Sequence, residues 1–510
     1  MKTKNRNAII KAVLCFVLIA VLVGIVCNDY EQKLSYATIN GYKINSFNGS
    51  NGQYLFLPGF ASSEDIVKSY ALKQESNLKI MQSSDIPAVF ITTQSGNLNS
   101  VYENKDNREA GTISVVNPDG TEDYSGGIKY IKGRGNYSWD NWDKKPFSIC
   151  LKKEASLLGL GTGNKYALIA NASDPTLIRN DVARDLEEAI NLKYSHTGQF
   201  VDLYINGDYM GNYYLIDTLD IGKERIDITD LDLKMQQQLR GTSISDFPVY
   251  ETPLIKGWNI PELLDDNTGG YLIEREFAGR YEVDYQENPS CFTTDYDEHF
   301  LVKSPCYCSK KQINYICSFV TDLEGAIRTG DGINPTTGKS YLDYMDVDSM
   351  AKKYLIEEFT KNYDSGVSSS YFYKDSDTVD SKLYAAPGWD YDMSLGNYLD
   401  WMDFSESGAD GYIHMTNNAD ASAWWENLFD KPEFSQKVLD LYYEELHSYV
   451  LEEELSRIDS LADTLKASAN MDYIRWKEMY DELGYIPGNV KEYDKLKQFI
   501  YDRIAFFDGE

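Results

Sequence analysis

Histidine and cysteine are both scarce in this chain, which has four histidines and seven cysteines among 510 residues. So few histidines count against a Ser-His-Asp nucleophile system. His196, the earliest of them, lies in a "YSHTG" loop without the sharp strand-to-helix turn that presents such a serine. The chain also lacks a glycine-rich Walker loop, an internal repeat and a low-complexity segment. Candidate chemistry must therefore be sought in other residue types, above all carboxylates.

Basic residues are outnumbered by acidic ones. The chain has 49 lysines and arginines against 80 aspartates and glutamates, which gives a net charge of −31. Such a surface repels phosphate backbones, so we expect no nucleic-acid partner. The same charge suits a basic protein partner. The composition is otherwise that of a globular protein, with 42% hydrophobic residues and 40 tyrosines, and the length predicts more than one domain.

Long apolar runs are confined to the N-terminus. Lys2, Lys4, Arg6 and Lys11 precede the uncharged run "AVLCFVLIAVLVGIVC". This pattern is typical of a secretory signal peptide or of a short signal anchor. Positive charges ahead of the run favour an uncleaved anchor over residues 1–27, with cleavage as the alternative. Both alternatives predict an extracytoplasmic protein, membrane-anchored or secreted.

Five cysteines lie beyond this leader. Four of them fall between residues 291 and 317, close enough for local pairing. In an oxidising compartment this spacing permits one or two disulfides, and free thiols are equally compatible with it. A zinc site is the alternative, but His299 is the only histidine among them and the spacing matches no zinc-finger pattern. The five are Cys150, Cys291, Cys306, Cys308 and Cys317.

The apolar patterns divide the chain into a strand-rich part and a helix-rich part. Residues 28–85 contain short β-like runs and form a lead-in of unassigned role. From residue 86, alternating segments predict strands, and "YINGDYMGNYYLID" predicts a hairpin with Asn206-Gly207 at its turn. After residue 340 the pattern is mostly helical. This order predicts an α+β fold with a cleft between two lobes.

Three shorter patterns predict local structure. Asp174 is expected to cap a helix that has Pro175 at its first position. Residues 287–310 are expected to form a loop-rich insertion. The segments "SYFYK" and "KLYAAPGW" are expected to pair as a short hairpin after a helix that ends near Asp364.

That hairpin bears on a group of aspartates. The stretch "GWDYDMSLGN" presents Asp390 and Asp392 one residue apart, and the hairpin would bring Asp364 back near Asp390. Carboxylates gathered in this way repel one another unless a cation such as Mg²⁺ lies between them. Phosphoryl transfer uses such a set, in which one carboxylate orients the attacking hydroxyl and others hold metal. The alternative is that these are solvated turn residues.

The strand-rich part offers complementary positive charge. In "KGRGNYSWDNWDKKPFSICL" a Gly133–Gly135 turn precedes a strand that begins at Lys144-Lys145. Backbone amides of a glycine turn can approach phosphate oxygens, and a lysine on the next strand can pair with them. Plain surface charge is the alternative for the lysines. Their combination with a distant carboxylate cluster favours a phosphate site.

Seven blocks in order now point to one family. The blocks "IKGRGNYSW", "KKPFSICL", "DPTLIRNDVA", "YINGDYMGNYYLID", "GGYLIE", "NYDS" and "GWDYDMSLGN" resemble the CotH kinase family of spore-coat and secreted proteins, over roughly residues 86–508. The resemblance implies a divergent, two-lobed protein-kinase-like fold over residues 86–510. The strand-rich N-lobe would cover about 86–220 and the helix-rich C-lobe about 221–510.

The resemblance also implies a reaction and its residues. A CotH kinase uses ATP with Mg²⁺ or Mn²⁺ to phosphorylate serine or threonine of a protein, here a secreted, cell-envelope or coat protein, and the acidic surface suits a basic, serine-rich one. By position, Asp364 resembles the catalytic aspartate that accepts a proton from the substrate hydroxyl. Asp390 resembles the metal-holding aspartate, and Asp392 is a second metal ligand or a structural residue.

Further residues take roles by the same resemblance. Lys145, with Lys144 as its rival, is similar to the strand lysine that contacts the ATP phosphates. Arg134 and Asn136 are expected near the nucleotide. Trp389 is an adenine-facing aromatic or, alternatively, a core residue.

A final block concerns the interface between the lobes. Asp174, Arg179 and Asn180 match the family's "D…LIRN" pattern. We expect them to orient the lobe interface, because an arginine buried beside a helix needs carboxylate partners.

One departure from the family pattern keeps a second function open. Kinases of this kind commonly place an asparagine shortly after the catalytic aspartate to hold a second metal, whereas this chain offers only Ser368, Ser369 and Ser370. The alternative function is therefore a non-catalytic, kinase-like scaffold or binding module in coat or cell-wall assembly. A metal-dependent hydrolase ranks last, because it does not explain the glycine turn and the lysine pair.

Overall fold

The structure is a computed structural model. It describes the backbone of four short strands between residues 37 and 81, and then residues 85–261, 264–398, 408–412 and 423–509. The predicted anchor over residues 1–27 lies outside the described residues. In the described part of the chain, no helix combines the length and the apolar character needed to cross a membrane.

The first strands form a small sheet of their own. Its four strands follow the order β1-β2-β3-β4, in which β3 and β4 are parallel and the other neighbours antiparallel. The strands are β1 (Ala37–Ile39), β2 (Tyr42–Gly49), β3 (Gly52–Phe56) and β4 (Lys79–Met81).

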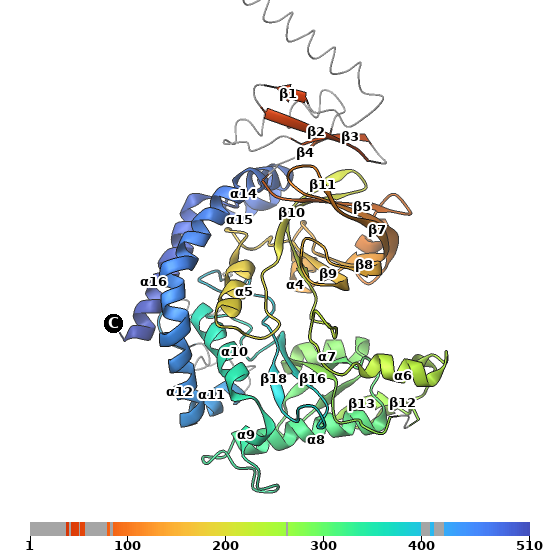
Figure 1. Cartoon of the computed structure of the whole chain (residues 1–510), viewed down its shortest axis with the longest axis vertical. Coiled ribbons are helices and arrows are strands. Elements are labelled where there is room, and N and C mark those ends of the chain that lie inside the picture. The colour runs from red at the N-terminus through yellow and green to blue at the C-terminus, as the bar shows by residue number, and fades with distance from the viewer. Residues whose placement is uncertain are drawn as a thin grey trace, which may run out of the picture.

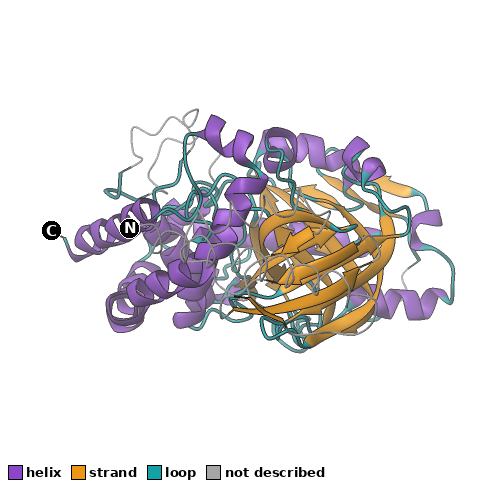
Figure 2. Ribbon diagram, turned by 90° about the horizontal axis from the view of Figure 1, so that it is seen from above, coloured by secondary structure: helices purple, strands orange, loops and turns teal. Residues whose placement is uncertain are grey.

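The next seven strands close into a barrel, seen end-on in Figure 2. They are β5 (Ala88–Thr93), β6 (Glu109–Val116), β7 (Glu122–Gly133), β8 (Phe147–Ala155), β9 (Gly163–Ile169), β10 (Gln199–Ile205) and β11 (Asp208–Asp217). The order around the barrel is β10-β11-β9-β8-β7-β6-β5, and a parallel pairing of β10 with β5 closes it. Inward side chains such as Val89, Ile113 and Leu151 fill the interior, as the alternating pattern requires.

The barrel includes the predicted hairpin. β10 and β11 are antiparallel, and Asn206 and Gly207 turn the chain with φ angles of 51° and 84°. Positive φ at both central residues is the type I′ geometry that Asn-Gly favours. The hairpin prediction is therefore confirmed.

The first long helix begins later than the sequence predicts. Helix α5 spans Arg179–Ala189, and Asp174 lies in a turn before it. Leu177 has a φ of 68°, which no α-helix accommodates, so the chain cannot be helical from Pro175 onward. The Asp174 carboxylate instead accepts hydrogen bonds from the backbone N–H groups of Thr176 and Arg179, both at 2.9 Å.

A second sheet of seven strands follows. Its order is β12-β13-β15-β16-β14-β17-β18. The strands are β12 (Val249–Glu251), β13 (Ile255–Trp258), β14 (Tyr271–Glu276), β15 (Cys291–Thr293), β16 (His299–Ser304), β17 (Ser370–Lys374) and β18 (Leu383–Ala385). The prediction of a loop-rich insertion over residues 287–310 was wrong, because β15 and β16 bury their apolar residues inside this sheet. The predicted β17–β18 hairpin is confirmed.

Helices surround this sheet and extend to the barrel (Figure 1). The longer ones are α8 (Lys310–Ile327), α10 (Val347–Thr360), α14 (Leu455–Arg475) and α16 (Val490–Asp508). The shorter ones are α3 (Asn99–Glu103), α4 (Tyr137–Asn141), α6 (Leu231–Leu239), α7 (Ala278–Glu287), α9 (Tyr341–Tyr344), α11 (Ala423–Phe429), α12 (Pro432–Leu441), α13 (His447–Tyr449) and α15 (Lys477–Leu483). The protein is thus a mixed α+β fold with a strand-rich and a helix-rich part.

One helical segment runs along both parts. Residues 432–475 are continuously helical from α12 to α14, with two π-helical turns at Tyr442–Leu446 and Val450–Glu454. Its first section packs on α10, and α14 packs on β11 of the barrel (Figure 1). Just beyond it, Met479 and Tyr480 of α15 join the residues that fill the barrel interior.

The cysteines beyond the leader all carry free thiols. Of the alternatives that the sequence leaves open, the structure therefore shows thiols rather than disulfides. Within the described residues, no three histidine, cysteine or acidic side chains are grouped as a metal site, so no zinc site is found there.

Candidate active site

The β17–β18 hairpin brings the predicted aspartates together. After α10 ends, Lys361 takes a left-handed conformation with a φ of 46° and turns the chain into the segment that contains Asp364. The hairpin then returns the chain beside this turn. The N–H of Tyr363 donates to the carbonyl of Met393 at 3.1 Å, and that of Leu395 donates to Thr360 at 2.7 Å.

Their carboxylates interact strongly. Burial raises the pKa of Asp364 well above its ordinary value, and the negative charges of Asp390 and Asp392 raise it further. Burial and then the charge of Asp390 raise the pKa of Asp392 to about 7. Such shifts mark carboxylates that lack sufficient compensating positive charge, which is typical of functional sites.

Asp390 has an unusual backbone conformation. Its φ is 68°, in the left-handed region that few residues other than glycine adopt. The residue is exposed by surface area, yet protein atoms surround its carboxylate closely enough that desolvation raises its pKa, while the nearby Arg134 opposes the rise. Strained conformations of this kind cluster at binding and catalytic sites.

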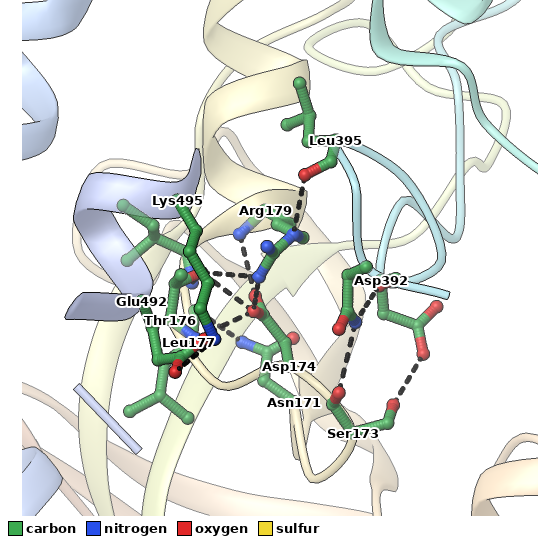
Figure 3. A network of polar contacts seen from close by, with 12 residues as sticks. Asn171, Ser173, Asp174, Thr176, Leu177, Arg179, Asp392, Leu395, Glu492 and Lys495 are labelled. Carbon is green, nitrogen blue, oxygen red and sulfur yellow. Dashed lines mark hydrogen bonds and ion pairs between the residues drawn. The ribbon is translucent and has the colours of Figure 1, made fainter. Parts of the chain in front are cut away.

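Asp392 is held by the turn that precedes α5. Ser173 donates a hydrogen bond from its hydroxyl to the Asp392 carboxylate at 3.1 Å. The side-chain amide of Asn397 donates to the carbonyl oxygens of both Asp392 and Ser173, at 2.7 and 3.1 Å. Figure 3 shows these contacts next to the Asp174 turn.

That turn is built around Asp174. Its buried carboxylate forms an ion pair with Arg179, and the Nε of Arg179 donates to the carbonyl of Leu395 at 3.3 Å (Figure 3). The structure thus places these two predicted residues between the barrel and the 388–395 segment. Their proposed role in orienting the interface stays a prediction.

One face of α5 holds the segment that carries Asp390. The Asn180 side chain accepts from the N–H of Tyr391 at 2.8 Å, and Arg184 donates to the carbonyl of Gly388 at 3.3 Å. The Glu187 carboxylate accepts from the N–H of Gly388 at 2.6 Å and from the hydroxyl of Tyr391 at 2.8 Å. Sequence reasoning found Asn180 but missed Arg184 and Glu187, although the spacings of four and three residues place all three on one helical face.

The two predicted lysines have other partners. Lys144 is fully buried and forms an ion pair with Asp472 of α14 at 2.9 Å. Lys145 donates to the backbone carbonyl of Trp139 and lies 5.7 Å from the centre of its ring. Burial lowers the pKa of both lysines. Their proposed contact with nucleotide phosphates stays a prediction.

Arg134 is a cation that does face the aspartates. Its guanidinium carbon lies 4.8 Å from the centre of the Trp389 ring, and its charge lowers the pKa of Asp390. Its Nη1 atom is buried and has no hydrogen-bond partner among the described residues. Asn136, two residues later, accepts from Lys105 at 2.5 Å and so fixes the loop that carries Arg134.

A narrow recess lies between the barrel, α5 and the segment that carries Asp390. Trp389 is half-buried at this recess rather than enclosed in the core. The lining comprises Ile169, Asn180, Arg184, Tyr214, Ile216, Gly388, Trp389, Asp390 and Tyr391.

A family model described as CotH kinase protein matches residues 131–507. The chain belongs to the CotH family. The resemblance carried by the seven sequence blocks is therefore confirmed. A comparison with curated proteins finds no match.

Two further carboxylates lie at the site of this CotH chain, and the sequence patterns did not reveal them. Glu276 of β14 accepts a hydrogen bond from the hydroxyl of Ser368 at 2.5 Å. Burial, the charge of Glu274 and, more weakly, the charge of Asp364 raise the pKa of Glu276 to about 9. Glu274 pairs with Lys303 at 2.8 Å. The available signal was a pair of glutamates two residues apart in a buried strand, of which Glu274 ends the family block "GGYLIE" and Glu276 follows it.

The CotH site offers the donors that a hard divalent cation prefers. Asp364, Asp390 and Asp392 supply carboxylate oxygens, and Ser173 supplies a hydroxyl. Their raised pKa values show a surplus of negative charge that Mg²⁺ or Mn²⁺ would relieve. In the part of the chain that the structure describes, no three acidic side chains already have ligand spacing. The donor set thus fits the metal in chemical kind, and binding would require side-chain adjustment.

Proposed function

We propose that the protein is an extracytoplasmic, ATP-dependent kinase that phosphorylates serine or threonine of secreted, cell-envelope or coat proteins. The observation that supports this proposal most directly is the convergence of Asp364, Asp390 and Asp392 from two separate segments, each with a raised pKa. Membership in the CotH family supports the kinase-like class.

Each aspartate has a role that its surroundings suit. Asp364 would orient the substrate hydroxyl and accept its proton, because a raised pKa makes a carboxylate a better base near neutral pH. Asp390 and Asp392 would hold Mg²⁺ or Mn²⁺. When bound, the metal would offset the negative charge of the phosphate oxygens.

The nucleotide would bind beside Trp389. The aromatic ring and the apolar lining of the recess suit the base, and Arg134 lies where positive charge could reach the phosphates. Lys145 is partly exposed and stays a candidate for a phosphate contact. The protein substrate would be basic and serine-rich, since the chain carries a net charge of −31.

Phosphate transfer from labelled ATP to a serine-rich peptide with flanking lysines tests the proposal. The wild-type protein should transfer phosphate, while Asp364→Asn and Asp390→Asn should each lose activity by at least about 100-fold. Asp119→Asn is the matched control, because Asp119 is exposed at the turn between β6 and β7. Undiminished transfer by Asp390→Asn would overturn the site assignment. A wild-type protein that neither transfers phosphate nor gains thermal stability with ATP and Mg²⁺ would overturn the kinase.

The second candidate is a non-catalytic scaffold or binding module in coat or cell-wall assembly. The observation in its favour concerns Ser368, which follows Asp364 where such kinases commonly have a metal-binding asparagine. The Ser368 hydroxyl already donates a hydrogen bond to Glu276. A thermal-shift measurement separates the candidates. Stabilisation by ATP with Mg²⁺ beyond that by either alone supports the enzyme, and no shift at millimolar nucleotide supports the scaffold.

A further inference from the structure

Arg134 combines three features that are unusual together. It stacks on the ring of Trp389, the residue next to Asp390 in the chain. Its Nη1 is buried without a hydrogen-bond partner in the described part of the protein. Leaving a buried charged donor unsatisfied is costly, so its retention calls for a ligand that would accept the bond.

The chemistry of such a ligand follows from the guanidinium group. An arginine fixed on an aromatic ring presents its remaining N–H groups in a plane and binds phosphate or carboxylate oxygens with two parallel bonds. Asp390 is the carboxylate whose charge acts most strongly on Arg134. Among the described residues, no hydrogen bond joins these two side chains. A phosphate beside Asp390 would supply the missing acceptor.

The same positive charge acts in the opposite direction on a free metal ion. A divalent cation at Asp390 would lie close to the guanidinium, and like charges repel strongly where water is partly excluded. If the cation arrives with phosphates, their negative charge lies between the two positive groups and the repulsion becomes attraction. Lys144 does not have this effect, because the Asp472 carboxylate compensates its charge.

We propose that Arg134 makes this site selective for a divalent cation bound to a nucleoside triphosphate, and that it opposes binding of the free cation. Arg134 is thus a specificity-determining residue that contacts the phosphates. This inference rests on the proposed function, since it assumes that the aspartates bind the metal of a metal–nucleotide complex.

The test measures two affinities whose changes should have opposite signs. Free Mn²⁺ is titrated into the protein without nucleotide and followed by the electron paramagnetic resonance signal of unbound Mn²⁺. The magnesium complex of a non-hydrolysable ATP analogue is titrated separately by calorimetry. Arg134→Met should bind free Mn²⁺ several-fold more tightly and should bind the magnesium–nucleotide complex about 10-fold more weakly than wild type.

Two further variants sharpen the result. Arg108→Met is the matched control, because Arg108 also stacks on an aromatic ring of the barrel, 4.6 Å from the centre of Tyr130, and should change neither affinity. Arg134→Lys keeps the charge but loses the planar pair of donors. It should keep the weak binding of free Mn²⁺ and lose part of the nucleotide affinity, which also provides a result if Arg134→Met fails to fold.

The outcomes separate this inference from the kinase itself. Equal or same-sign changes in the two affinities of Arg134→Met would overturn the selectivity role and leave the kinase standing. Opposite changes would support the role of Arg134 whether or not the wild-type protein transfers phosphate to the test peptide. A wild-type protein that binds neither Mn²⁺ nor the magnesium–nucleotide complex would overturn both.

Discussion

Lys144 and Asp472 form an ion pair of 2.9 Å between side chains that have no exposed surface and lie 328 residues apart in the sequence. The pair joins the start of β8 to α14. The other oxygen of Asp472 accepts from the N–H of Asn212 at 2.9 Å, and Gly211 permits this approach because a Cβ there would lie 2.1 Å from that oxygen. A residue expected to contact nucleotide thus connects the barrel to the C-terminal helices.

Breaking this pair should destabilise the protein severely. Asp472→Ala should lower the free energy of unfolding by about 3–5 kcal/mol, because it leaves the Lys144 ammonium buried without its partner. Urea unfolding followed by circular dichroism measures the change. Asp481→Ala is the control, since it removes the exposed pair with Lys477 and should cost less than about 1 kcal/mol. Similar losses of unfolding free energy in the two variants would show that the buried pair contributes no more to stability than the exposed pair.

The neighbouring Asp202 should make stability depend on pH. Burial raises its pKa to about 7, and it accepts from the hydroxyls of Ser468 at 2.7 Å and Tyr209 at 2.9 Å. An unfolded aspartate has a pKa of about 4, so the folded protein binds the extra proton between pH 4 and 7. The contribution of Asp202 to stability should therefore be present at low pH and decline as the pH rises toward 7.

Urea unfolding of wild type and Asp202→Asn across this pH range isolates the contribution. The difference in unfolding free energy between the two proteins should change with pH in favour of the asparagine variant as the pH rises. A difference that stays constant from pH 4 to pH 8 would show that Asp202 does not titrate in this way.

Glu187 should position the segment that carries Asp390. Glu187→Ala leaves two buried donors unpaired, the N–H of Gly388 and the hydroxyl of Tyr391, at a cost of about 1–3 kcal/mol each. The variant should lose stability and, if the protein is a kinase, most of its phosphate transfer. Glu187→Gln keeps a carbonyl acceptor and should retain much of both.

The adjacent Glu188 provides the control for this helix. Its side chain is exposed and points about 100° around α5 from that of Glu187, so Glu188→Ala should match wild type in melting temperature and in phosphate transfer. If Glu187→Ala melted and reacted like Glu188→Ala, the positioning role would be wrong.

The free thiols should differ sharply in reactivity. Burial raises the pKa of Cys308 well above its ordinary value and raises the pKa of Cys291 and Cys317 to about 11. Cys306 is only partly buried, so it should be alkylated by iodoacetamide before these three in the native protein. Peptide mass spectrometry after timed labelling measures the order. Disulfide-linked peptides from the native protein would contradict the free thiols.

Local patterns predicted much of this fold. Asn206-Gly207 specified its hairpin because only a few residues tolerate the required φ angles, and the "SYFYK" and "KLYAAP" strands paired as expected. The start of α5 was misplaced because Asp174 and Pro175 resemble a helix start. The observed turn differs from a helix start because Leu177 takes a positive φ and the Asp174 carboxylate binds the backbone and the side chain of Arg179.

The candidate site was predictable only where it is local. Asp364 and Asp390 are joined by one hairpin, so their proximity could be inferred from about thirty residues of sequence. The partners of Lys144, Arg134 and Glu276 come from distant segments, and no periodicity in the sequence specifies them. The sequence shows where lysines and arginines occur, but it could not show that the side chain of Arg134, rather than that of Lys144, would face the aspartates.

Met479 and Tyr480, which complete the barrel interior, have a consequence for biosynthesis. The strands of the barrel end at residue 217, yet part of their apolar filling emerges from the ribosome more than 260 residues later. A nascent chain that has made only the strands would lack part of this apolar packing, so the barrel should reach its final stability after translation is nearly complete. A truncation before α15 would therefore destabilise the barrel, although the barrel strands lie far from the truncation in sequence.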